Sequence, residues 1–518
     1  MNERTDQADV VRFLSDPGSH GGAAVERIDT HASIVFLAGT QAFKLKRAVK
    51  YDYLDFSTLE LRKRFCEAEM RVNSRMAPAL YRRVVPVVRS STGALALDGE
   101  GAPVDWVIEM NRFDQDALFD RMAARGCLDL ALMAPLAEEI ASFHDACEPR
   151  PEFGGEAGMA RVIQGNAAGF RDFGGGTLDD AASESLTRAA VESLRSGSRL
   201  LESRRKAGFV RECHGDLHLG NIVLFAGRPT LFDAIEFNDD IACVDVMYDL
   251  AFLLMDLWHR GLPRHANAIL NSYLAETQDL DGLAALPLFL SCRAAIRAKT
   301  TATAARLQQE PALQGRMQVR AREYLDLAIR LLRPPPPAIV AIGGLSGSGK
   351  STVARALAPS LGAAPGAVIL RSDEIRKRLC HTAPLTKLDR AGYTPEVSAR
   401  VYEALAAGAS VIGATGHSVI VDAVFARAED RAAIERAARS CGLPFAALWL
   451  DAPERTLIER VTQRASDVSD ADADVVRMQY AQWSGDAPWL RVDAGADEAT
   501  VAARAHRRLR SQLIERAA

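Results

Sequence analysis

Residues 338–351, AIVAIGGLSGSGKS, decide the fold of the C-terminal part of the chain. A short apolar run of strand type leads into the pattern G-x-x-x-x-G-K-[ST], and a helical run follows it. In such a loop, glycines let successive backbone N–H groups face phosphates, and the helix adds its positive N-terminus. We expect Lys350 to reach the β- and γ-phosphates of ATP and the Ser351 hydroxyl to bind Mg²⁺. The nucleotide-binding candidates are Gly344, Leu345, Ser346, Gly347, Ser348, Gly349, Lys350, Ser351 and Thr352.

Strand-like and helical runs alternate after this loop, which predicts a parallel sheet with helices on both faces. Asp373 follows the strand-like run AVILR, at the edge where α/β sheets bind ligands. It could activate or position a substrate hydroxyl, or cap the next helix; the two roles are compatible. Arg376, one turn later, could hold a substrate anion or lie in solvent.

Three further side chains are candidates in this half. Asp422 stands near the end of the strand-like run SVIVDAVF, where it could orient the water shell of Mg²⁺ or only cap a helix. Arg460 and Arg464 lie four residues apart on one helix face. This pair suits a lid that closes on the triphosphate, although a solvated helix face has the same pattern.

The stretches GLSGSGKST, RSDEIR and VIVDAVF, with the R-x-x-x-R helix, resemble the small P-loop kinases of the gluconate-kinase, zeta-toxin and polynucleotide-kinase group. The resemblance spans about residues 338–490. It implies that Asp373 is the substrate-activating carboxylate and that Arg460 or Arg464 is the lid arginine. It leaves the acceptor open.

A second catalytic pattern, HGDLHLGN, occupies residues 214–221. Asp216 and Asn221 have the five-residue spacing of a kinase catalytic loop, in which the Asp takes a hydroxyl proton and the Asn binds Mg²⁺. Asp233 lies twelve residues further on, where a second metal-binding aspartate is expected. The pattern resembles the aminoglycoside phosphotransferases and choline kinases, which share the protein-kinase fold. That likeness implies Asp216 as the base and Asn221 and Asp233 as metal ligands.

The sequence departs from that family at the second metal element, where Asp-Ala-Ile-Glu236 replaces the usual Asp-Phe-Glu or Asp-Leu-Gly. Either Asp233 or Glu236 could then be the metal ligand, and the spacing favours Asp233.

A kinase-like lobe also needs a strand lysine paired with a helix glutamate. Lys44 and Lys46 point to the same face of one strand, and Lys44 fits the V-A-x-K pattern better. Glu69 falls within an apolar helix stripe, so it is preferred over Glu67 as the partner. The chain has no G-x-G-x-x-G before these strands, and the turn ending at Ser33 would contact the phosphates instead.

These patterns predict two domains: an α+β bilobal protein-kinase-like domain, then an α/β P-loop kinase domain with a parallel sheet. We place the first at residues 1–332, with lobes at about 20–112 and 113–332, a proline linker at 333–337 and the second at 338–518. This order resembles a bacterial fused family, the bifunctional aminoglycoside phosphotransferase/ATP-binding proteins. We expect a transferase with ATP and Mg²⁺ as cofactors at two sites, acting on small hydroxylated acceptors. The alternatives are a P-loop kinase with a regulatory N-terminal domain, or a polynucleotide 5′-kinase.

Composition narrows the class of protein. The chain has 518 residues, of which 63 are Lys or Arg and 67 are Asp or Glu, so the net charge is −4. This balance argues against a nucleic-acid partner over the whole surface. The sequence has no apolar run of membrane-spanning length, no signal-like start and no C-x-x-C pair among its eight cysteines. We therefore expect a cytoplasmic protein with reduced thiols and no membrane partner; the oligomeric state and both acceptors are left open.

Overall fold

The computed structural model describes residues 3–51, 54–383, 385–463, 468–483, 485 and 487–517. It divides into two compact units, Met1–Val162 with Ser198–Asp256, and Ile163–Gly197 with Leu257–Ala518. Each unit combines segments that are separate in the sequence but in contact in space. The division therefore does not test the predicted domain boundary at 333–337, which stays a prediction. Within the described residues, every helix is too short or too polar to serve as a membrane-spanning segment.

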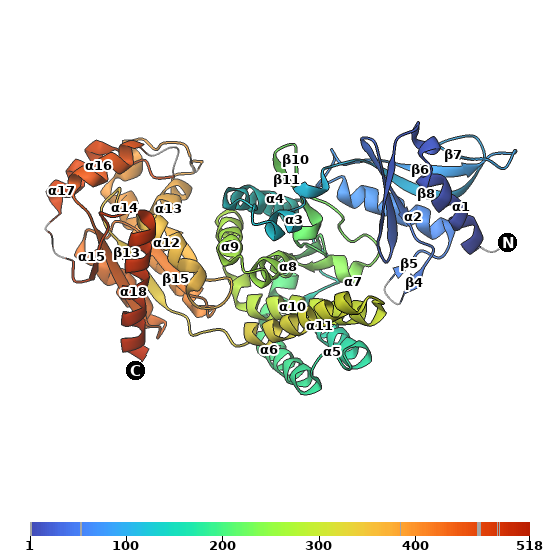
Figure 1. Ribbon diagram of the computed structural model, residues 1–518. Helices are drawn as coiled ribbons and strands as arrows, with labels where there is room; N and C mark the ends of the chain where they lie inside the picture. Colours follow the sequence, from blue (N-terminus) through green and yellow to red (C-terminus); the bar gives the residue numbers. More distant parts are fainter. Residues whose placement is uncertain are drawn as a thin grey trace. The chain divides into compact units, whose positions relative to one another are not determined.

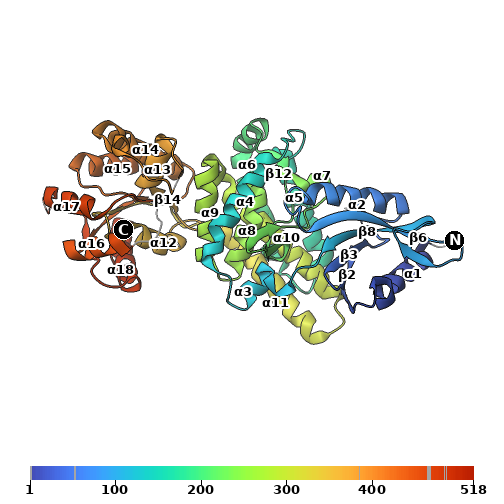
Figure 2. The ribbon, with the colours of Figure 1, turned by 90° about the horizontal axis from the view of Figure 1, so that it is seen from above.

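The first unit contains an antiparallel sheet in the order β1-β2-β3-β8-β6-β7. The strands of this sheet are β1 Val25–Asp29, β2 Ser33–Ala38, β3 Gln41–Lys46, β6 Tyr81–Arg89, β7 Leu95–Leu97 and β8 Ala102–Asn111. The helix α2 Leu59–Asn73 covers one face and α1 Glu3–Ser15 the other (Figure 2). The expected strand with Lys44 and the expected helix with Glu69 are therefore present, whereas the sequence reasoning missed α1.

Strand alternation sorts the side chains of β3 between the two faces. Phe43 and Leu45 join the core beside α1, together with Val10 and Leu14. Ala42 joins the core beside α2, and Lys44 and Lys46 share its face. Both lysines therefore meet the glutamate that α2 carries.

The remaining described elements of this region are short strands and helices around the HGDLHLGN loop. The strands are β4 Lys50–Tyr51, β5 Leu54–Asp55, β9 Val210–Glu212, β10 Ile222–Phe225, β11 Arg228–Leu231 and β12 Cys243–Asp245. The helices are α3 Phe119–Ala124, α4 Met133–Ala146, α7 Asp239–Ala242 and α8 Val246–His259. The hairpin β10–β11 separates the loop from Asp233.

The second unit begins with helices: parts of α5 Gly155–Phe173 and α6 Asp180–Lys206, then α9 Pro263–Thr277, α10 Leu286–Leu307 and α11 Pro311–Leu331. Proline starts α11 because its missing N–H is not needed in a first helical turn. Two helices, α10 and α11, therefore precede the proline linker.

The parallel sheet of the second unit has the order β14-β15-β13-β16-β17. Its strands are β13 Ile339–Gly343, β14 Val368–Arg371, β15 Val419–Asp422, β16 Phe445–Asp451 and β17 Leu490–Asp493. The helices are α12 Lys350–Leu357, α13 Ser372–Leu379, α14 Pro395–Ala414, α15 Ala428–Ser440, α16 Glu454–Gln463, α17 Ala473–Gln482 and α18 Glu498–Ala517. In Figures 1 and 2, α12 and α18 lie on one face of the sheet and α13, α14 and α15 on the other.

The architecture predicted from the sequence is confirmed: an α+β part with an antiparallel sheet precedes an α/β part in which a parallel sheet carries the phosphate-loop pattern. The central strand β13 is buried along its whole length, as an apolar strand covered on both faces requires. Because parallel strands end at one sheet edge, the residues that follow β13, β14 and β15 are brought together there.

Candidate functional site

The candidate phosphate loop connects β13 to α12. Two of its positions need glycine, because neighbouring backbone atoms lie too close for a Cβ atom. Gly344 and Gly347 have φ angles of 148° and 84°, which side chains rarely adopt. A Cβ atom on Gly344 would lie 2.7 Å from the carbonyl oxygen of Leu450, and one on Gly347 would lie 2.6 Å from that of Leu457. The loop is therefore packed against β16 and α16 in a shape that only glycine permits.

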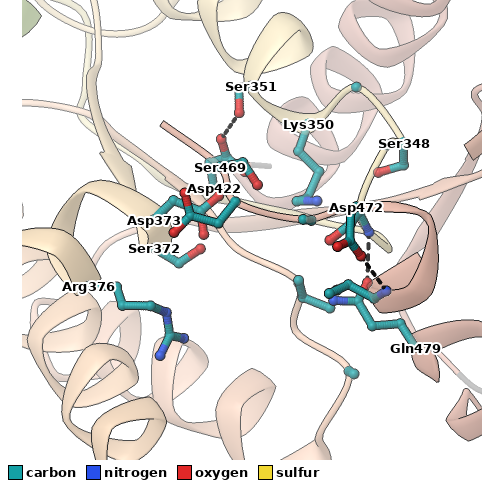
Figure 3. A pocket seen from close by; sticks show the side chains of 18 of the residues that line it. Ser348, Lys350, Ser351, Ser372, Asp373, Arg376, Asp422, Ser469, Asp472 and Gln479 are labelled. Carbon is teal, nitrogen blue, oxygen red and sulfur yellow. Dashed lines mark hydrogen bonds between the residues drawn. The ribbon is translucent and has the colours of Figure 1, made fainter. Parts of the chain in front are cut away.

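The metal-binding candidates of this half are in direct contact. The Ser351 hydroxyl, in the first turn of α12, donates a hydrogen bond of 2.5 Å to Oδ2 of Asp422, at the end of β15 (Figure 3). Asp422 is buried, and Nε of Arg371 lies 3.6 Å from the same oxygen. A hydroxyl and a carboxylate are the hard oxygen ligands that Mg²⁺ prefers, so this pair fits the metal.

Two other loop groups already have partners from the chain. The Nζ of Lys350 donates to the carbonyl oxygen of Leu345, at 3.1 Å. The backbone N–H of Ser346 donates to Oε1 of Gln479 on α17, at 2.9 Å. The sequence reasoning missed Gln479, because only the packing of α17 brings it to the loop.

A cleft of about 1410 Å³ opens beside this loop. Asp373 lines it from the first turn of α13, together with Lys350 and Asp422. Figure 3 shows Asp373 and Arg376 on one side of the cleft and Gln479 on the other. The structure therefore brings the expected base candidate, the loop lysine and the metal candidates into one space.

Arg376 is mostly buried in the wall of this cleft. One of its terminal nitrogens donates to the carbonyl oxygen of Gly392 at 2.9 Å and to Oγ of Ser398 at 3.3 Å. Its guanidinium also lies 4.9 Å from the ring centre of Tyr393. These contacts rule out the solvated alternative for Arg376.

Of the two arginines proposed for a lid, the structure describes one. Arg460, on α16, lines the cleft and donates to the carbonyl oxygen of Ala496 at 2.8 Å. Arg464 lies outside the described residues. The lid role of both arginines stays a prediction.

In the first unit, Glu69 joins the two strand lysines. Its Oε1 lies 2.7 Å from Nζ of Lys44, and its Oε2 lies 2.6 Å from Nζ of Lys46. Lys44 also pairs with Asp233, and Lys46 with Glu236. Glu69, which the sequence analysis preferred over Glu67, is the glutamate that contacts the lysines. For the other two choices, both residues of each pair are engaged: one ion pair joins Lys44 to Asp233, and a second joins Lys46 to Glu236.

The two glutamates respond to burial differently. Burial acts to raise the pKa of Glu69, but the two lysines outweigh it and lower the pKa to about 2. Glu236 is buried near the charge of Glu69, so its pKa rises to about 7 despite its pairing with Lys46. Asp233 is the more exposed of the two metal candidates, with 43% of its side chain accessible.

The catalytic-loop candidates also meet. The Nδ2 of Asn221 donates to Oδ2 of Asp216 at 3.1 Å and to its carbonyl oxygen at 3.0 Å. The Nε2 of His218 lies 3.4 Å from the same carboxylate oxygen. Ser33, the proposed phosphate contact, is the buried first residue of β2 and pairs with Lys46 across the sheet.

Asp249, on α8, braces this loop. It accepts hydrogen bonds from the backbone N–H of His214 at 3.1 Å and of Gly215 at 2.8 Å. The Nε2 of His144 lies 3.1 Å from the same carboxylate. A fully buried carboxylate with these partners holds the loop that carries Asp216.

Comparisons with known proteins give partial matches. The family model described as AAA domain matches residues 339–485. An uncharacterised protein of Mycobacterium tuberculosis is 28% identical over 481 residues, 91% of this chain and 93% of that protein. The adenylyl-sulfate kinase of Myxococcus xanthus is 34% identical over 122 residues, 24% of this chain and 62% of that protein. A choline/ethanolamine kinase family protein from Mesorhizobium loti aligns with a TM-score of 0.34 at 13% identity, covering 61% of this chain and 99% of that one.

Proposed function

We propose that the chain is an ATP-dependent kinase whose P-loop half transfers a phosphoryl group to a hydroxyl of a small molecule. The contact between Ser351 and Asp422, in a loop that only glycine permits, carries this proposal. Asp373 in the same cleft would take or orient the acceptor hydroxyl proton. The similarity of this half to an adenylyl-sulfate kinase supports the same reaction class.

The chain's own residues would act around the bound nucleotide. The backbone N–H groups from Gly344 to Gly349 and the Lys350 ammonium would hold the phosphates, and Gln479 would leave the Ser346 N–H when a phosphate binds there. Mg²⁺ would be held near Ser351 and Asp422 and would neutralise phosphate charge.

We further propose a second nucleotide site in the kinase-like half. The contacts that favour it are the pairing of Lys44 with Glu69 and Asp233, together with Asn221 beside Asp216. Asp216 would be the base, and Asn221 and Asp233 would hold Mg²⁺ with oxygen ligands. The competing hypothesis is that this half only binds nucleotide and regulates the P-loop half.

Phosphotransfer from labelled ATP to a pooled library of sugars, polyols, nucleosides and aminoglycosides tests these proposals. The assay compares the wild type with Asp216→Ala and Lys350→Ala. If Lys350→Ala abolishes transfer to one acceptor and Asp216→Ala abolishes transfer to another, both sites are catalytic. Loss with Lys350→Ala alone favours the regulatory hypothesis, and turnover that survives both substitutions contradicts the proposed function. A parallel assay with 5′-hydroxyl oligonucleotides tests polynucleotide kinase activity.

A further inference from the structure

The strand that leads to Asp373 lies at the edge of the parallel sheet. Among the described strands, β14 pairs only with β15, and α13 with Asp373 follows it directly. An edge strand has a row of backbone groups without strand partners. Motion of this strand would move Asp373 relative to the phosphate loop, which lies beyond β15 on β13.

The helix α9 satisfies that open edge with two asparagine side chains. The Oδ1 of Asn271 accepts from the backbone N–H of Ile369 at 2.7 Å, and its Nδ2 donates to the carbonyl oxygen of Ala367 at 3.3 Å. One side-chain amide therefore makes the pair of bonds that a neighbouring strand residue would make. Helix and strand both belong to the second compact unit, and Figure 2 shows α9 beside β14.

Asn267, one turn earlier on the same helix face, completes the arrangement. Its Nδ2 donates to the carbonyl oxygens of Pro365 at 3.2 Å and Ala367 at 3.0 Å. Its Oδ1 accepts from Nδ2 of Asn271 at 3.2 Å. Asn267 is 3% exposed, so its amide depends on these bonds.

Bonds within α9 account for only part of this pair, since Nδ2 of Asn271 also donates to the carbonyl oxygen of Asn267, at 3.0 Å. Asparagine is a weak helix former, and two of them at i and i+4 within α9 lower its intrinsic stability. Their amides are directed at backbone groups about 96 to 100 residues away in the sequence. Because α9 precedes the proline run and β14 follows it, the bonds tie the P-loop sheet to the helices before the linker.

We propose that Asn267 and Asn271 are positioning residues that hold β14, and thereby Asp373, in the geometry needed for phosphotransfer. This inference rests on the proposed function of the P-loop site. Neither asparagine lines the cleft, so each acts through β14. A helix encoded before the proline run thus supports the P-loop half by fixing the strand that leads to Asp373.

The test uses the full chain with three variants. Asn271→Ala removes the bonds to Ala367 and Ile369 together with those to Asn267, and Asn271→Asp keeps an acceptor for the Ile369 N–H. Glu276→Ala, an exposed position of the same helix, is the control. Hydrogen exchange by mass spectrometry follows peptides that cover 365–375 and 344–352. Binding of the ATP analogue AMPPNP and phosphotransfer to the pooled acceptors are measured in parallel.

We expect Asn271→Ala to speed exchange in 365–375 by about tenfold, as the loss of two part-buried hydrogen bonds allows. Turnover should fall by about 10- to 100-fold, because small misplacements of a catalytic group have effects of this size. The dissociation constant of AMPPNP should change by less than about twofold, since β13 does not contact α9 through these bonds. Asn271→Asp should give intermediate exchange, and Glu276→Ala should match the wild type.

Unchanged exchange in 365–375 would overturn the inference, and so would wild-type turnover in Asn271→Ala. Equal losses of AMPPNP binding and turnover would also overturn it, because they indicate general damage to the domain. If the wild type transfers phosphate to no acceptor, the proposed function fails, and the exchange data alone decide whether the asparagines hold β14.

Discussion

The ion-pair cluster around Glu69 permits a quantitative prediction. Glu69 is fully buried and is the only side chain that contacts both Lys44 and Lys46 among the described ion pairs. Its pKa lies at about 2 instead of 4.5, which corresponds to about 3 kcal/mol in favour of the ionised form. Removing one partner of a buried ion pair costs about 3–5 kcal/mol of folding stability, which is similar to the free energy that the lowered pKa implies. We expect Glu69→Gln to destabilise the first unit by about 3 kcal/mol at pH 7.

The pH dependence follows from the direction of the shift. A carboxylate whose pKa is lowered in the folded state contributes stability above its unfolded pKa of 4.5, and this contribution disappears as the pH falls towards 2. The stability difference between the wild type and Glu69→Gln should therefore be largest above pH 4.5 and should narrow below it.

Scanning calorimetry of the full chain is the assay. For a unit of this size, a loss of about 3 kcal/mol lowers the midpoint of its transition by about 6–12 °C. Glu67→Gln is the matched control, because Glu67 lies on the same helix with 58% of its side chain exposed and only a 3.8 Å contact to Lys63. We expect that control to stay within about 0.5 kcal/mol. Equal shifts in the two variants, or a difference that stays constant from pH 7 to pH 3, would refute the reasoning.

Three further predictions concern the two sites. Gly347→Ala should abolish AMPPNP binding measured by calorimetry, because its Cβ would lie 2.6 Å from a carbonyl oxygen. Gly349→Ala has a φ of 87° but no atom within 4 Å of its Cβ, so this variant should bind AMPPNP more tightly than Gly347→Ala. The reverse order of affinities would contradict the packing argument. Ser351→Ala should lower turnover at least about tenfold and raise the Mg²⁺ concentration needed for half-maximal rate. Thr352→Ala changes a nucleotide-binding candidate without a metal role, so its Mg²⁺ requirement should stay unchanged; an unchanged requirement in Ser351→Ala would exclude the metal role. Asp249→Asn should speed hydrogen exchange by about tenfold at His214 or Gly215, because each N–H is accepted by a different carboxylate oxygen and one of these becomes a donor; unchanged protection at both would show that Asp249 does not hold the loop.

Much of the fold could be read from local patterns. The run from Ile339 to Gly343 and the loop after it predict a strand, a phosphate loop and a helix, because each step depends on neighbouring residues. The five-residue spacing of Asp216 and Asn221 likewise places both side chains in one loop, and they are hydrogen-bonded there. The helix α1 was missed, because its polar sequence gave little sign that Val10 and Leu14 cover a sheet.

The sequence by itself determined which residue types are available for chemistry: a glycine loop with Lys350, an aspartate after β14, and a kinase-like loop around Asp216. Only the tertiary structure decided between Lys44 and Lys46 as the partner of Glu69. Both are its partners, since each of its two carboxylate oxygens contacts one lysine. It also decided that Gln479 meets the phosphate loop and that asparagines of α9 hold β14. The last two contacts join residues that lie 133 and 98 positions apart in the sequence. Short-range periodicity carries no information about such pairings.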